Sequence, residues 1–389
     1  MVFRTVFLIS LIFLSGCFDW FSAEQKTEKD PFAPSKDEIR IGEFSSVTGA
    51  QAPFGRATHE GIQLAVKQAN QDGGVLGKKI RLIHYDDQGD VTRVVENVKQ
   101  LVEKDRVHVL IGEVSSSFSL EAAKLAQAYR VPMVTPSSTS PQITQVGDRI
   151  FRVCFTDVFQ GEVLARFSVN HLKLKRVAIL TDQNSAYGRG LAKFFKQYHE
   201  QLSGLIVADF SYEEGQTNFK DLIQKILKEE PEVLFIPGYF PEASQIMKVA
   251  RAQGFKGVFM GGDGWDSEGK LVELAGEAAI GGFFSNHFSY EDRNPMAQKF
   301  VREFRAEYGK YPNAMAATGY DAAGVVIHSL KRLGHLTRDA LTQSISETKN
   351  YAGATGIITL NRQRDAIKPA VVLKVSSGTQ NQYVLTINP

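Results

Sequence analysis

Residues 107–141 read VHVLIGEVSSSFSLEAAKLAQAYRVPMVTPSSTSP, and this stretch indicates the fold class. Residues 107–111 form a β-rich apolar run. From Ala122 onward apolar residues recur at i, i+3, i+4 and i+7, which is the pattern of a helix packed on one face. A second apolar run follows at 131–135. Because both runs are continuously apolar rather than alternating, they predict parallel strands in a sheet that helices cover on both faces.

The same strand-then-helix unit repeats on both sides of this stretch. Upstream, strands are expected at 39–44 and 80–85, each followed by a helix. The series restarts downstream of Arg152, where the expected strands are 176–180, 205–210, 232–236 and 258–260. Two successive series predict an α/β protein with two doubly wound, Rossmann-like lobes and a ligand cleft between them.

The C-terminal part does not extend either series. Residues 295–346 read as mostly helical and strands return after Thr355, so the chain is expected to cross between the lobes again. We therefore expect one division of the folded chain into two lobes. The N-terminal lobe would contain residues 38–157 plus 286–354, and the C-terminal lobe residues 158–285 plus 355–389.

Residues 1–16 form a predicted secretory signal. Arg4 supplies a positive charge, and the apolar run after it is about half the length of a membrane-spanning helix. The ending Leu14-Ser15-Gly16-Cys17 resembles the bacterial lipoprotein box, which implies that Cys17 carries a lipid and becomes the mature N-terminus. The alternative is an ordinary secretory signal with an incidental cysteine. Residues 17–37, which are polar from Ser22 onward, are expected to provide the anchor and a flexible tether.

Composition excludes several classes of protein. The 389 residues include 45 Lys+Arg and 43 Asp+Glu, a formal net charge of +2, so no surface for nucleic acid is expected. Cys154 is the only cysteine after Cys17, so an internal disulfide in the folded body is excluded and Cys154 is expected to be buried. The eight histidines do not occur at metal-ligand spacing, and no metal site is expected.

Catalytic and cofactor motifs are missing from the sequence. No G-x-G-x-x-G follows a strand, no G-x-S-x-G is present, and the glycine-rich stretch 73–79 lacks the spacing and hydroxyl of a P-loop. We therefore expect neither an enzyme nor a cofactor. A hydrolase that uses Ser116 or Ser137 is an alternative, but it would need a histidine base that no loop obviously supplies.

Candidate binding residues follow the expected strands, where ligands bind in open α/β sheets. In the first series, loops 112–117 and 135–141 are rich in hydroxyls and open helices, so their hydroxyls and free N–H groups can hold a carboxylate. Each of these serines and threonines could instead be a simple cap or turn residue. In the second series, Asp263 lies in a glycine-rich turn and could face an ammonium group, or could cap its own backbone. Together the loops fit a zwitterion such as an α-amino acid.

At this point the sequence resembles the branched-chain amino-acid receptors of ABC importers, the leucine/isoleucine/valine-binding type within the type I periplasmic binding fold. The resemblance runs from about Ile39 to Leu360. It is carried by an ordered set of motifs: Gly49 to Gly55, Ala69-Asn70-x-x-Gly73-Gly74-Val75-x-Gly77, Tyr85-Asp86-Asp87, Gly112 to Ser117, Pro136 to Pro141, Ala186 to Gly190, Gly238 to Glu242, and Gly261 to Gly264.

The resemblance implies a role for each of a set of residues. The ligand carboxylate would be held by the first lobe and the ammonium group by Asp263 and a backbone carbonyl near Ser137 or Ser138. Aromatic rings would wall the cleft. The implied ligand-binding residues are Phe54, Ser116, Ser137, Ser138, Thr139, Tyr187, Tyr239 and Asp263. Two departures from the family are visible: Asp263 stands where Glu is frequent, and Gln88 and Ser115 stand where a first-lobe disulfide is expected.

The function implied by the resemblance is that of a substrate-binding receptor. It would close its lobes on a small amino acid or amide and deliver it to an inner-membrane ABC permease, while a lipid anchor holds it on the periplasmic side of a membrane or on the outer cell surface. The alternative is a lipoprotein that kept the fold without a ligand and acts through protein interactions in the envelope.

Overall fold

The computed structural model describes Met1, residues 32–378 and residues 380–389. Most of the predicted signal peptide, Cys17 and the first part of the expected tether lie outside the described residues. Within the described part of the chain, no helix is both long enough and apolar enough to span a bilayer.

The first lobe is built on a parallel sheet with strand order β2-β1-β3-β4-β5. Its strands are β1 (Ile39–Ser45), β2 (Ile80–Asp86), β3 (Val109–Ile111), β4 (Met133–Thr135) and β5 (Ile150–Arg152). The helices of this part are α1 (Ala52–Gln71), α2 (Val91–Lys99), α3 (Ser116–Ala128), α4 (Gln142–Gln145), α10 (Pro295–Tyr308), α11 (Ala314–Lys331) and α12 (Arg338–Ser346). The strand-then-helix order predicted from residues 107–141 is confirmed, since β3, α3 and β4 occupy that stretch.

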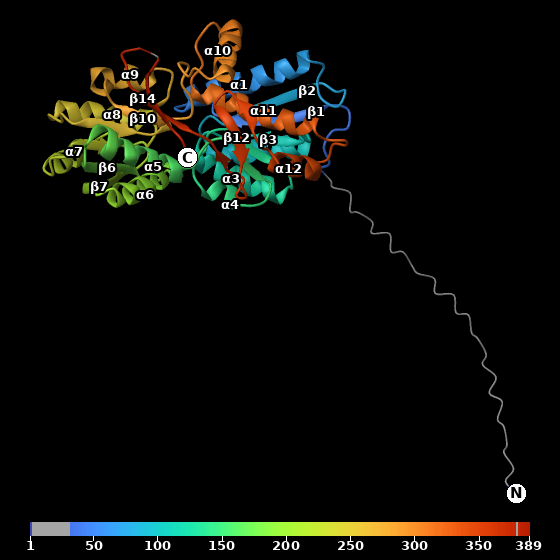
Figure 1. The fold of residues 1–389 in the computed structure, drawn as a ribbon, viewed down its shortest axis with the longest axis horizontal. Coiled ribbons are helices and arrows are strands. Elements are labelled where there is room, and N and C mark those ends of the chain that lie inside the picture. The colour runs from blue at the N-terminus through green and yellow to red at the C-terminus, as the bar shows by residue number, and fades with distance from the viewer. Residues whose placement is uncertain (2–31, 379) are drawn as a thin grey trace.

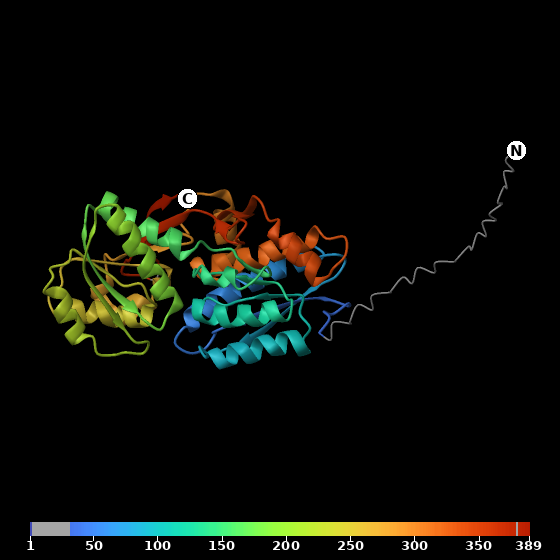
Figure 2. The ribbon, with the colours of Figure 1, turned by 90° about the horizontal axis from the view of Figure 1, so that it is seen from below.

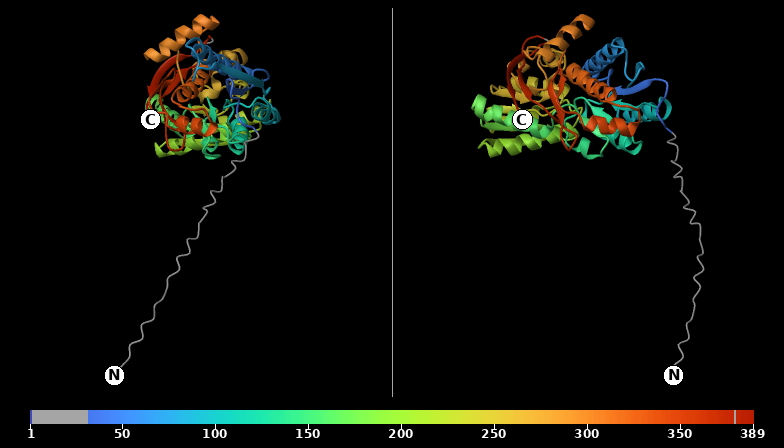
Figure 3. Two further views of the ribbon diagram at one scale, coloured as in Figure 1. Left: turned by 90° about the vertical axis from the view of Figure 1, so that its right-hand side faces the viewer. Right: turned by 45° about the vertical axis from the view of Figure 1, so that its right-hand side comes forward.

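The second lobe contains a seven-stranded sheet of order β15-β14-β10-β9-β8-β6-β7. Its strands are β6 (Arg176–Asp182), β7 (Leu205–Tyr212), β8 (Val233–Phe235), β9 (Val258–Gly261), β10 (Phe283–Asn286), β14 (Ala370–Lys374) and β15 (Gln382–Ile387), and its helices are α5 (Asp157–Arg166), α6 (Ala186–Gln201), α7 (Lys220–Leu227), α8 (Phe240–Ala252) and α9 (Lys270–Ala275). β14 and β15 are antiparallel to their neighbours. The C-terminus lies against this lobe (Figures 1 and 3), where Leu385 and Ile387 pack on its core.

Figure 2 shows the two lobes side by side, the second in green and yellow and the first in blue, cyan and orange. A small antiparallel sheet of β11 (Tyr351–Gly353), β12 (Gly356–Leu360) and β13 (Ala366–Ile367) joins neither large sheet. Ile358 and Leu360 of β12 pack in the core of the first lobe. The expected division gave residues 355–389 to the second lobe, whereas β12 and β13 pack with the first, so we propose that the chain crosses finally at Lys368–Pro369. Strand pattern alone did not reveal which core these short strands join.

Helices α1 and α11 cross closely because glycines lie at their contact. A Cβ on Gly61 would lie 2.0 Å from the carbonyl oxygen of Ala316, and one on Gly319 would lie 2.5 Å from the carbonyl oxygen of Thr58. Both obstacles are backbone atoms, which cannot move without shifting a whole helix. This approach fixes α1, and with it Phe54, relative to α11.

We expect Gly61→Ala to lower the free energy of unfolding by about 1–3 kcal/mol, because the added methyl group overpacks the helix contact. Urea unfolding followed by circular dichroism measures the change. Gln63→Ala, on the exposed face of the same helix, is the matched control and should leave stability nearly unchanged. Equal stability of the two variants would contradict the close crossing.

Candidate functional site

A small cavity lies where the two lobes meet, with about 220 Å³ of unfilled space. Its walls come from loops at the carboxyl ends of strands in both sheets and from the first turns of α1 and α11. The lining residues are Phe54, Val114, Ser116, Ser137, Thr139, Tyr187, Tyr239, Asp263, Gly264 and Met315. The cavity therefore brings together seven of the eight residues expected to bind a ligand, all except Ser138.

The first lobe presents hydroxyl groups to this cavity. Ser116 opens α3, and its Oγ accepts a hydrogen bond from the backbone N–H of Ser140 at 3.3 Å. The Thr139 hydroxyl is buried and makes no hydrogen bond of good geometry within the described chain, although it interacts with the Asp157 carboxyl. The preceding residue, Ser115, makes no side-chain cap on α3. The Thr139 hydroxyl and the backbone N–H groups at the start of α3 can therefore bind an anionic group.

Ser138 does not line the cavity, although the resemblance implied that it binds the ligand. Its Oγ lies 2.8 Å from the carbonyl oxygen of Glu113 and 2.7 Å from Ser119 Oγ. Its carbonyl oxygen accepts a hydrogen bond from Arg152 Nη1 at 2.9 Å. Ser138 therefore holds the loop in place, because its polar groups are already used by the first lobe.

Three aromatic rings enclose the cavity. The Phe54 ring lies 5.9 Å from that of Tyr239, and the Tyr239 ring lies 5.2 Å from that of Tyr187, between centroids. Phe54 belongs to the first lobe and both tyrosines to the second. Aromatic pairs at such distances are attractive, so this contact across the lobes contributes to holding the cavity closed.

Asp263 enters the cavity from the second lobe, on a single 3-10 turn of residues 263–265 that follows β9. Its Oδ1 accepts a hydrogen bond from Gln160 Nε2 at 2.6 Å, and its Oδ2 lies 3.2 Å from His287 Nε2. The turn requires glycine on its N-terminal side, because a Cβ on Gly262 would lie 2.3 Å from the Tyr187 hydroxyl oxygen. The two partners fix the carboxylate and leave part of it facing the cavity.

Sequence reasoning missed three groups around Asp263. Gln160 and His287 orient it, and Asp157 stands at the start of α5 nearby. Burial raises the pKa of the Asp157 carboxyl to about 8; a hydrogen bond from the Thr139 hydroxyl opposes this shift and the negative charge of Asp263 adds to it. Asp157 is therefore largely protonated at neutral pH. Burial also lowers the pKa of His287, against the opposing effect of Asp263. His287 directly follows β10, so a sequence search of the residues after every expected strand would have included it.

The lobes are closed in this structure. The backbone N–H of Ala186 in the second lobe donates to Ser117 Oγ of the first at 3.1 Å. Lys310, from the loop before α11, lies 2.9 Å from both Glu268 of the second lobe and Glu60 of α1. The Ala186–Ser117 and Lys310–Glu268 contacts cross between the lobes and would have to break before the cavity could open to solvent.

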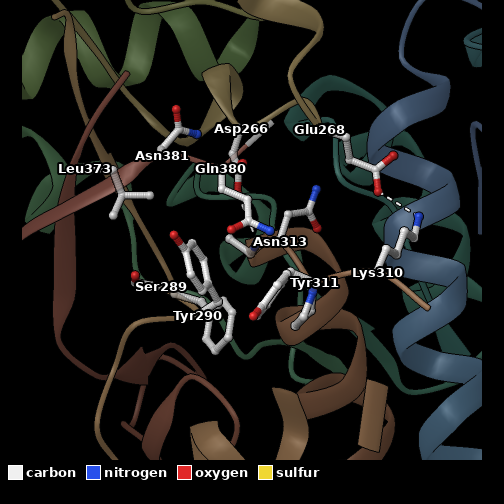
Figure 4. A pocket seen from close by; sticks show the side chains of 13 residues that line it. Asp266, Glu268, Ser289, Tyr290, Lys310, Tyr311, Asn313, Leu373, Gln380 and Asn381 are labelled. Carbon is white, nitrogen blue, oxygen red and sulfur yellow. Dashed lines mark hydrogen bonds and ion pairs between the residues drawn. The ribbon is translucent and has the colours of Figure 1, made fainter. Parts of the chain in front are cut away.

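A second pocket lies beside this lysine. Figure 4 shows Tyr290 and Tyr311 facing each other there, with the Lys310–Glu268 ion pair at one side. Its buried carboxylate, Asp266, already accepts hydrogen bonds from Asn286 Nδ2 at 2.9 Å and from the backbone N–H of Ala314 at 3.0 Å. The charged groups of this pocket are thus paired with each other or with the backbone. The smaller cavity is the better candidate site, because hydroxyls of the first lobe and the Asp263 carboxylate of the second line it together.

Comparison with known proteins gives a consistent result. Residues 38–380 match a family model described as periplasmic binding protein. A curated amino acid binding protein of Pseudomonas aeruginosa is 30% identical over 321 residues, which cover 82% of this chain and 79% of that protein. A leucine-specific-binding protein of Salmonella typhimurium is 30% identical over 272 residues, covering 70% and 73% of the two chains.

Solved structures agree in fold. A leucine binding protein from Thermotoga maritima is 36% identical, with a TM-score of 0.86, and the match covers 90% of this chain and 99% of that one. A branched-chain amino acid transporter substrate binding protein from Streptococcus pneumoniae, solved with isoleucine, is 28% identical with a TM-score of 0.84, covering 90% and 100%. The predicted two-lobed α/β architecture is confirmed by these matches.

Proposed function

The chain belongs to the periplasmic binding protein family, so it acts as an exported solute-binding receptor, and we propose that its solute is a small α-amino acid. The observation that carries this proposal is the composition of one closed cavity. It has a buried hydroxyl, Thr139, on the first lobe and a carboxylate, Asp263, on the second. Such a cavity is complementary to a molecule with a carboxylate at one end and an ammonium group at the other.

The remaining walls favour an apolar side chain of modest size. Phe54, Val114 and Met315 are buried hydrophobic residues of the lining. The cavity itself is small, and three of its ten lining residues are these apolar side chains. We therefore propose an aliphatic amino acid, or a closely related amide, as the solute.

Delivery requires a partner in the membrane. We propose that the loaded receptor docks on an inner-membrane ABC permease, and that a lipid on Cys17 tethers it to the cell envelope through residues 17–37. We propose no catalytic role. The hydroxyl of Ser137 pairs with Thr318 Oγ1 at 2.7 Å and that of Ser116 with a backbone N–H, so within the described chain neither serine is hydrogen-bonded to a histidine base.

A thermal-shift screen tests the proposal. Aliphatic amino acids are expected to raise the melting temperature, because a solute at about 100 times its Kd stabilises the native state by about 2.7 kcal/mol. For the best amino acid, the matched acid without the amine and the matched amine without the acid should both lose most of the shift. If no amino acid or amide raises the melting temperature, the alternative of a ligand-free interaction protein is favoured instead.

A further inference from the structure

Three side chains with metal-binding atoms meet at one side of the first lobe. Glu43 lies on β1, His59 on α1 and His84 on β2, and their ligand atoms all lie within 4.8 Å of one another. Glu43 and His84 are paired in the register of the parallel strands β1 and β2, so their side chains stand on the same face of the sheet. α1 packs over that face and brings His59 Nδ1 to 2.7 Å from Glu43 Oε2. The linear spacing of the histidines gave no sign of this cluster.

The electrostatics around the cluster favour a cation. The Glu43 side chain is fully buried, and His59 is its only ion-pair partner within the described residues. Burying a carboxylate is costly unless it is paired. The carboxylate of Asp86 adds a further negative charge near His84, and that of Glu60, which is itself paired with Lys310 at 2.9 Å, acts on His59. No lysine or arginine of the described chain forms an ion pair with Glu43.

The geometry is suited to metal coordination. The two imidazole rings are close, with centroids 4.5 Å apart. Ser45 Oγ lies 3.0 Å from His84 Nε2 and 3.5 Å from Glu43 Oε1, so it can orient both side chains by hydrogen bonding, as outer partners do in metal sites. The His59 side chain is 27% exposed, which gives an ion access from solvent.

We propose that Glu43, His59 and His84 form a binding site for a divalent transition-metal ion, for which Zn²⁺ is the natural probe. Two imidazoles and one carboxylate are a ligand set that zinc takes with water in its fourth position. The bound ion would link β1, α1 and β2. None of the three residues lines the solute cavity, so the site is separate from amino acid binding.

The test uses the purified protein without a histidine tag, after treatment with a chelator. Calorimetric titration with zinc chloride is expected to show one ion per chain, and thermal unfolding should shift upward with zinc. His84→Ala and the milder His84→Gln should each weaken zinc binding at least tenfold. His335→Ala, at an exposed histidine outside the cluster, is the matched control and should bind as the wild type does.

Three further results would bear on the proposal. Absorption bands of bound Co²⁺ should appear with the wild type and vanish in His84→Gln, while the solute shift stays intact in both. Zinc binding that is equal in the wild type and both His84 variants would overturn the proposal, since scattered surface groups would then be responsible. No zinc binding by the wild type would also overturn it and would leave the cluster as a buried ion pair, without any bearing on the amino acid site.

Discussion

Asp263→Asn is expected to weaken binding of the best amino acid about 30-fold to 5,000-fold, which corresponds to 2–5 kcal/mol. The substitution keeps the size of the side chain and an oxygen that can accept the hydrogen bond from Gln160. It removes the negative charge that faces the cavity. The ammonium group of the solute would then be buried without a charge partner, which accounts for most of the loss. Calorimetric titration measures the change.

Two readouts separate this role from a structural one. The ligand-free melting temperature of Asp263→Asn should be equal to or above that of the wild type, because a buried charge is lost without a change in volume. Asp209→Asn, at an exposed position of β7 that pairs with Lys196, is the matched control and should bind normally. Affinity of Asp263→Asn within twofold of the wild type would remove the zwitterion model.

Arg152→Met is expected to lower the free energy of unfolding by about 3–5 kcal/mol, the loss that follows when one partner of a buried ion pair is removed. Arg152 is fully buried at the end of β5. Its Nε lies 2.5 Å from Asp365 Oδ1, and Nη2 donates to the carbonyl oxygen of Ser140 at 2.7 Å. With Nη1 on Ser138, the guanidinium holds both ends of the segment that contains Thr139. Denaturant unfolding of the ligand-free protein measures the loss.

The controls for this prediction are two other arginine variants. Arg166→Met removes an exposed arginine that pairs with Glu162 within one helix, and should change stability by less than about 1 kcal/mol. Arg152→Lys keeps the charge but cannot reproduce the planar set of donors, so an intermediate loss is expected. If Arg152→Met were as stable as Arg166→Met, this buried cluster would not be what fixes the Thr139 loop.

The same loop explains why part of the site was predictable and part was not. Hydroxyls at 135–141 follow a strand, so their arrival at the lobe junction could be expected from the sequence. Which of them faces the cavity could not, because Ser138 and Thr139 are chemically similar and adjacent. Contacts with Glu113, Ser119 and Arg152 hold Ser138 against the first lobe, whereas Thr139 lines the cavity.

By itself, the sequence determined the alternation of strands and helices, the two successive α/β series and the strand ends at which a ligand would bind. These features depend on periodicity and on loop position, which are local properties of the chain. Only the tertiary structure decided the partners of Asp263, the core against which β12 and β13 pack, and the meeting of Glu43, His59 and His84. Those arrangements depend on the packing of segments that are far apart in sequence. The orientation of each side chain is set there by the distant group that buries it or forms a hydrogen bond with it.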